Sequence, residues 1–120
     1  MAKGDDLQDR LISYAARIIK VSNSLPKTMA GRHVSGQLLR SGTAPAAHYG
    51  EARGAESASD FIHKLKIAVK ELNESEVWLR IIRDSTMLTE AQLNQLLDES
   101  NQLQRILSAS IGTARKSADH

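Results

Sequence analysis

The sequence has no cysteine, two prolines, and only one tryptophan, two tyrosines and one phenylalanine in 120 residues. Without cysteine, disulfides, thiolate metal ligands and a cysteine nucleophile are all excluded. No run approaches the roughly 18 apolar residues that a membrane-spanning helix needs. The N-terminal stretch MAKGDDLQDR is charged and lacks the apolar region of a signal peptide. We therefore expect a cytoplasmic protein with no membrane association.

The chain does contain enough apolar residues for one domain, because 41% of its residues are hydrophobic. The net charge of +2 is only a weak hint of an acidic partner. Its distribution is more informative. Residues 27–70 carry seven basic and three acidic side chains, a net +4, whereas residues 71–111 carry three basic and seven acidic ones, a net −4. The chain is therefore electrically polarised along its length.

Apolar residues alternate at spacings of three and four along three segments, which predicts amphipathic helices at about 5–24, 57–83 and 89–115. Pro26 ends the first of them. Ser57 with Asp60, and Thr89 with Gln92, have the spacing of a capping box at the start of the other two. The predicted core stripes are Leu7, Leu11, Tyr14, Ile18, Val21 and Leu25, then Phe61, Leu65, Ala68, Leu72, Leu79 and Ile82, then Leu93, Leu96, Leu97, Leu103, Leu107 and Ile111.

The segment at about 28–54 is an unusual helix, because its interior contains Gly31, Gly36, Gly42, Gly50 and Pro45. In a helix interior each glycine costs about 1 kcal/mol and a proline about 3 kcal/mol relative to alanine. We expect a helix kinked near Ser41, whose carbonyl would face the missing amide of Pro45. Small residues such as Gly42 would offset the cost by allowing close packing. With short connections between consecutive helices, the prediction is an all-α, up-down-up-down antiparallel four-helix bundle, a single domain over residues 1–120.

A recognisable pattern runs from the second helix into the third and consists of Gln37, Leu38, Arg40, Ser41, Thr43, Glu51, Asp60, Phe61, Ile62, Lys64, Leu65, Glu71, Trp78, Leu79 and Arg80. This pattern resembles that of a known bacterial group, the four-helix bundle proteins related to those encoded in intervening sequences of large-subunit ribosomal RNA. The resemblance covers most of the chain, and His48 stands where asparagine is common.

This resemblance implies a cytoplasmic bundle that assembles as a homo-oligomer. A similar protein, the accessory protein of diversity-generating retroelements, forms a pentameric, basic, RNA-binding barrel, so the resemblance implies a cyclic assembly, a pentamer. It carries over no catalytic residue and no cofactor.

Sequence patterns for catalysis or metal binding are weak. No two histidines are spaced i, i+4, and His48 with Glu51 gives a single i, i+3 pair, whereas di-iron bundles need several such ligands. Ser41 and Thr43 are interpreted as hydroxyls that bond back to their own helix rather than as nucleophiles. We therefore predict no catalytic, cofactor or metal site.

Two kinds of contact surface remain. A basic set could contact phosphates non-specifically or could equally be a solvated face; it comprises Arg32, Arg40, Arg53, Lys64, Lys66 and Lys70. On the third helix, Ile67, Trp78 and Ile81 fall away from the core stripe, which predicts packing against a second subunit or the N-terminal tail. The predicted function is a non-enzymatic oligomeric scaffold or adaptor for RNA, DNA or a nucleic-acid enzyme. The alternative is a purely protein-binding module without nucleic-acid affinity.

Overall fold

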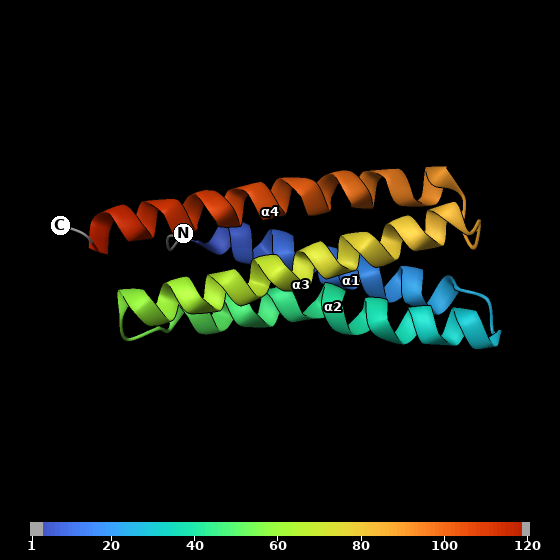
Figure 1. Cartoon of the computed structure of the whole chain (residues 1–120), viewed down its shortest axis with the longest axis horizontal. Coiled ribbons are helices and arrows are strands. Elements are labelled where there is room, and N and C mark those ends of the chain that lie inside the picture. The colour runs from blue at the N-terminus through green and yellow to red at the C-terminus, as the bar shows by residue number, and fades with distance from the viewer. Residues whose placement is uncertain (1–3, 119–120) are drawn as a thin grey trace.

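Four helices make up residues 4–118, the part of the chain that the computed structural model describes: α1 (Asp5–Ser24), α2 (Met29–Arg53), α3 (Ala58–Asp84) and α4 (Glu90–Ala118). They form a rod about 52 Å long in which consecutive helices run antiparallel, and the start of α1 and the end of α4 lie toward the same end of the bundle (Figure 1). Packing is extensive between α1 and α2, α2 and α3, and α3 and α4, and sparser between α1 and α4. The predicted four-helix bundle is confirmed.

The predicted helix starts are confirmed by their caps. Ser57 Oγ accepts a hydrogen bond from the Asp60 amide at 3.0 Å. At α4 the cap is reciprocal, since Thr89 Oγ1 accepts from the Gln92 amide at 3.3 Å while Gln92 Oε1 accepts from the Thr89 amide at 2.9 Å. Each cap satisfies backbone donors that have no partner within the helix.

Helix α2 continues unbroken through Pro45, so the glycines and proline do not divide it into loops. Close packing explains part of this. A Cβ atom added to Gly42 would lie 2.6 Å from Ile18 Cγ2 of α1, which is closer than real side chains approach. Gly36 faces open space, so packing does not require a glycine there. The bend near Ser41 stays a prediction.

The core is formed by the predicted stripes, together with a polar layer that the stripes do not reveal. Tyr14 is 1% exposed, and its hydroxyl lies 2.8 Å from Ser75 Oγ, across the bundle from α1 to α3. Ser75 Oγ also donates to the Leu72 carbonyl at 2.7 Å, and Ser100 of α4 is fully buried as well. Buried polar groups that are paired in this way restrict how the helices can slide past one another. Apolar side chains from all four helices complete the core around this layer.

None of the helices within residues 4–118 is both long enough and apolar enough to cross a membrane.

Candidate functional site

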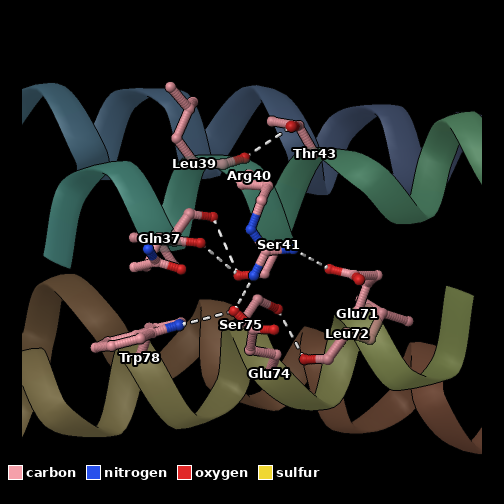
Figure 2. Close-up of polar contacts among 11 residues, drawn as sticks. Gln37, Leu39, Arg40, Ser41, Thr43, Glu71, Leu72, Glu74, Ser75 and Trp78 are labelled. Carbon is pink, nitrogen blue, oxygen red and sulfur yellow. Dashed lines mark hydrogen bonds and ion pairs between the residues drawn. The ribbon is translucent and has the colours of Figure 1, made fainter. Parts of the chain in front are cut away.

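The most developed polar site joins α2 to α3 and centres on Arg40. Its guanidinium donates to Glu71 Oε2 at 2.9 Å and also to Glu74 Oε2, and Trp78 Nε1 donates to the same Glu74 oxygen at 3.1 Å (Figure 2). The hydrogen bond between Arg40 and Glu74 raises the pKa of Arg40 and, with help from Trp78, lowers the pKa of Glu74. Arg40, Glu71 and Trp78, which the family resemblance singled out, thus form one connected network with Glu74, which it did not.

The hydroxyls beside this network bond within their own helix, as predicted. Ser41 Oγ donates to the Gln37 carbonyl at 2.8 Å, and Thr43 Oγ1 donates to the Leu39 carbonyl at 2.7 Å. Ser41 is fully buried, and its hydroxyl adds a hydrogen bond to a backbone carbonyl of α2 one turn before Pro45. Both hydroxyls therefore bond within α2.

The ion pair network predicts a small, pH-dependent contribution to stability. Because folding lowers the pKa of Glu74, this contribution is complete above the ordinary carboxyl value of about 4.5 and is lost as pH falls through the lower folded value. Arg40 and Glu74 are 51% and 37% exposed, so Arg40→Gln should cost about 1 kcal/mol or less at pH 7. In urea unfolding at several pH values between about 3 and 7, the free energy of unfolding should fall less steeply toward low pH in the variant than in the wild type. The matched control is Arg32→Gln, since Arg32 has no ion pair among residues 4–118. If the free energy of unfolding fell equally with decreasing pH in all three proteins, the prediction would be contradicted.

The six predicted phosphate contacts do not form one free basic surface. Arg40 is paired as described, Arg53 donates to Asp5 Oδ1 at 2.7 Å, and Lys64 donates to Glu51 Oε2 at 3.3 Å. The Lys64 contact lowers the pKa of Glu51. The other three cations have exposed side chains: Arg32 on α2, and Lys66 and Lys70 on α3.

His48 and Glu51 approach each other but do not form a metal site. His48 Nδ1 lies 3.7 Å from Glu51 Oε2, too far for a hydrogen bond. Within residues 4–118 no three His, Cys, Asp or Glu side chains are grouped so that they could hold a metal ion.

The three predicted interface residues on α3 have different environments. Ile67 and Trp78 are half-buried, and Trp78 packs against the core while its ring meets His33 of α2 edge-on, with centroids 5.8 Å apart. Ile81 is 39% exposed, and Val77, which the sequence argument did not name, is 43% exposed. The large apolar side chains that α3 presents to solvent are therefore Val77 and Ile81.

A cavity of about 770 Å³ lies near the start of α1 and the last turns of α4 and was not predicted. It opens where the last turns of α4 extend past the start of α1, and Tyr49, Phe61, Ile106 and Thr113 are among its lining residues. Arg53 also lines it, but this charge is paired with Asp5. Apolar and hydroxyl groups thus dominate the cavity. Only the relative lengths of α1 and α4 could have signalled it.

Two comparisons with known proteins identify relatives of the chain. A crystal structure of a protein of unknown function, from the S23 ribosomal protein family of Bacteroides thetaiotaomicron, is similar with a TM-score of 0.83 and 34% identity, covering 88% of this chain and 97% of that one. No curated protein matches the sequence. A family model for the 23S rRNA-intervening sequence protein matches residues 6–109. The chain therefore belongs to the 23S rRNA-intervening sequence protein family.

Proposed function

We propose that this protein is a non-enzymatic, homo-oligomeric helical bundle of the cytoplasm that serves as a scaffold or adaptor for another macromolecule. RNA, DNA or a nucleic-acid enzyme is the leading partner. The observation that carries the proposal is the outward stripe of α3, defined by Lys66, Lys70, Val77 and Ile81, all of which are exposed.

This outward stripe combines two kinds of contact on one helix face. At about 100° per residue, the four side chains fall within roughly 60° of one another around the helix axis. The N-terminal half of the stripe is cationic, which suits phosphate groups. The C-terminal half is apolar and borders a hollow lined by Val77, Arg80, Ile81, Asp84 and Ser85, which suits a protein contact.

The assembly part of the proposal follows from the apolar half of the stripe. Ile81, with Ile67 and Trp78 at its edge, would pack against another subunit, as the sequence predicts. The family resemblance supports a cyclic homo-oligomer, a pentamer, in which each subunit would present its basic half outward.

A second candidate is a protein-binding module without nucleic-acid affinity. One observation favours it: Arg40, Arg53 and Lys64 are each paired with a carboxylate, so half of the predicted phosphate contacts are already neutralised. Any nucleic-acid binding would then depend on the exposed Arg32, Lys66 and Lys70. It would be non-specific and would weaken steeply with salt.

A gel-shift titration with labelled RNA and DNA distinguishes these two functions. At about 50 mM salt we expect a shift that weakens steeply by about 200 mM. The double variant Lys66→Gln/Lys70→Gln should bind less tightly and should reduce the salt slope by about 1.8 for duplex DNA and about 1.4 for single strands. The exposed Arg105 on α4 provides the control, Arg105→Gln, which should bind like the wild type. No shift at low salt would contradict nucleic-acid binding and favour the protein-binding module.

A further inference from the structure

At one end of the bundle, α4 extends well beyond the start of α1. Arg10 Nη2 of α1 donates to Glu99 Oε1 of α4 at 2.6 Å, so these two residues lie at the same level of the bundle. Beyond that level α1 continues only to Asp5, whereas α4 continues to Ala118. At about 1.5 Å per residue, α4 extends roughly 20 Å past the start of α1 (Figure 1). The last turns of α4 therefore have no helical residue of α1 beside them.

The cavity of about 770 Å³ lies at this corner of the bundle. Its walls come from the other three helices: Tyr49 from α2, Phe61 from α3, and Ile106 and Ala114 from α4. The two aromatic rings offer flat apolar surface, and the small alanine leaves room between the helices. The volume falls within the range of about 300–1,000 Å³ that is usual for small-molecule sites. The corner is therefore large enough and apolar enough to hold a small molecule.

The Tyr49 hydroxyl is a buried polar group that lies at this cavity without a partner. Tyr49 is 7% exposed, and its hydroxyl has no hydrogen-bond partner within residues 4–118. A Cβ added to Gly4, which also lines the cavity, would lie 2.7 Å from Tyr49 Oη, so the hydroxyl lies at the α1 end of the cavity. Burial raises the pKa of Tyr49, so the hydroxyl keeps its proton at neutral pH and can donate it. An acceptor atom of a bound molecule would satisfy this donor.

The charges around the cavity favour a neutral ligand. Among the described residues that line it, Arg53 alone is charged, and its guanidinium donates to Asp5 Oδ1 at 2.7 Å. A carboxylate or phosphate ligand would have to compete with Asp5 for this cation, and Asp6 adds a second negative charge to the first turn of α1. A cationic ligand would find no carboxylate among the described lining residues. Apolar contact and hydrogen bonding, rather than charge, therefore determine which ligand fits.

We propose that this cavity binds a neutral, largely apolar small molecule that carries one acceptor oxygen, such as an aromatic ketone or ester. The apolar body would pack against Phe61, Ile106 and Ala114, and the oxygen would accept a hydrogen bond from Tyr49 Oη. The cavity shares no residue with the outward stripe of α3. The inference therefore goes beyond the scaffold function and does not depend on it.

Two probes of matched shape test the inference by calorimetric titration of the full chain. Acetylnaphthalene is a neutral ketone, and ethylnaphthalene lacks its oxygen. The wild type should bind both probes, because the apolar body fits the cavity in either case. In Tyr49→Phe, acetylnaphthalene should bind about tenfold less tightly, since one hydrogen bond is lost, whereas the affinity for ethylnaphthalene should be unchanged.

A larger side chain in the cavity should block both probes. Ala114→Phe fills the space between α4 and the aromatic rings and should lower both affinities by about tenfold or more. Ala109→Phe is a second blocking variant at an exposed lining position, where a larger side chain disturbs the core less. The matched control is Ser108→Phe, since Ser108 is exposed on the same helix and does not line the cavity; it should bind like the wild type. Circular dichroism would verify that all variants remain helical.

The possible results separate this inference from the proposed function. A wild type that binds neither probe would overturn the inference, as would binding that persists unchanged in both Ala114→Phe and Ala109→Phe. An unchanged affinity of Tyr49→Phe for acetylnaphthalene would overturn the hydrogen bond to the ligand oxygen. None of these results would change the mass of the assembly or the gel shift, which test the scaffold proposal independently.

Discussion

Replacing Tyr14 with alanine should destabilise the bundle by about 3–5 kcal/mol, the usual cost of deleting a buried aromatic ring. Tyr14 is 1% exposed, and its side chain reaches from α1 through the interior to Ser75 of α3. The variant would leave a cavity at the middle of the rod and would remove the hydroxyl that meets Ser75. Chemical unfolding followed by circular dichroism measures the loss. A change below about 1 kcal/mol would show that the polar layer is not part of a packed core.

The control for this change is Tyr14→Phe, which keeps the ring and removes only the hydroxyl. It should cost about 1 kcal/mol, because one buried hydrogen bond is lost while Ser75 retains its bond to the Leu72 carbonyl. Burial raises the pKa of Tyr14 above its ordinary value of 10.0. The wild type should therefore lose stability as pH rises above about 10, through the folded pKa. Tyr14→Phe should show a shallower alkaline loss, with Tyr49, whose pKa burial also raises, accounting for part of the remainder.

Replacing Gly42 with alanine should destabilise the bundle by up to about 2 kcal/mol, because overpacking a core typically costs about 1–3 kcal/mol and the better helix propensity of alanine returns about 1 kcal/mol. The added Cβ would lie 2.6 Å from Ile18 Cγ2 and 2.7 Å from Ile18 Cγ1, and Ile18 is fully buried. Alanine favours the helix by about 1 kcal/mol relative to glycine, so the measured loss is what remains after that gain. Thermal and urea unfolding would report it.

Gly36→Ala is the matched control, because it lies in the same helix with no atom within 4 Å of the added Cβ. It should stabilise the protein by about 0.5–1 kcal/mol through helix propensity alone. If both alanine variants stabilised the protein equally, close packing at Gly42 would be disproved as the reason for a glycine there.

Most of the fold could be predicted because local chemistry determines it. The alternating apolar spacing placed three helices, and Ser57 and Thr89 marked two helix starts that the structure confirms. Helix α2 was the difficult case, since its intrinsic propensity disfavours a helix. Packing against Ile18 shows how tertiary contacts outweigh that preference.

The surfaces were harder to predict, because the exposure of a side chain depends on which helix packs against its side of the helix. Trp78 lies away from the core stripe in sequence, yet α2 lies beside it and His33 contacts its ring. Arg40 looked like a free cation until the fold placed it against Glu71 and Glu74, more than thirty residues away.

The buried serines show a signal that could have been used. Ser75 and Ser100 occupy positions that continue the apolar stripes of α3 and α4, where a hydroxyl is unexpected. A serine at such a position indicates a buried polar partner. That the partner of Ser75 is Tyr14 follows only from the structure, in which the Tyr14 side chain reaches across the bundle.

Light scattering coupled to size-exclusion chromatography tests the central claim, self-assembly, most directly. The chain has a mass of 13.2 kDa. We predict a mass that is a multiple of this value and that holds across working concentrations, with a pentamer expected from the family resemblance. A mass of one chain at every concentration would contradict assembly, and with it the scaffold function.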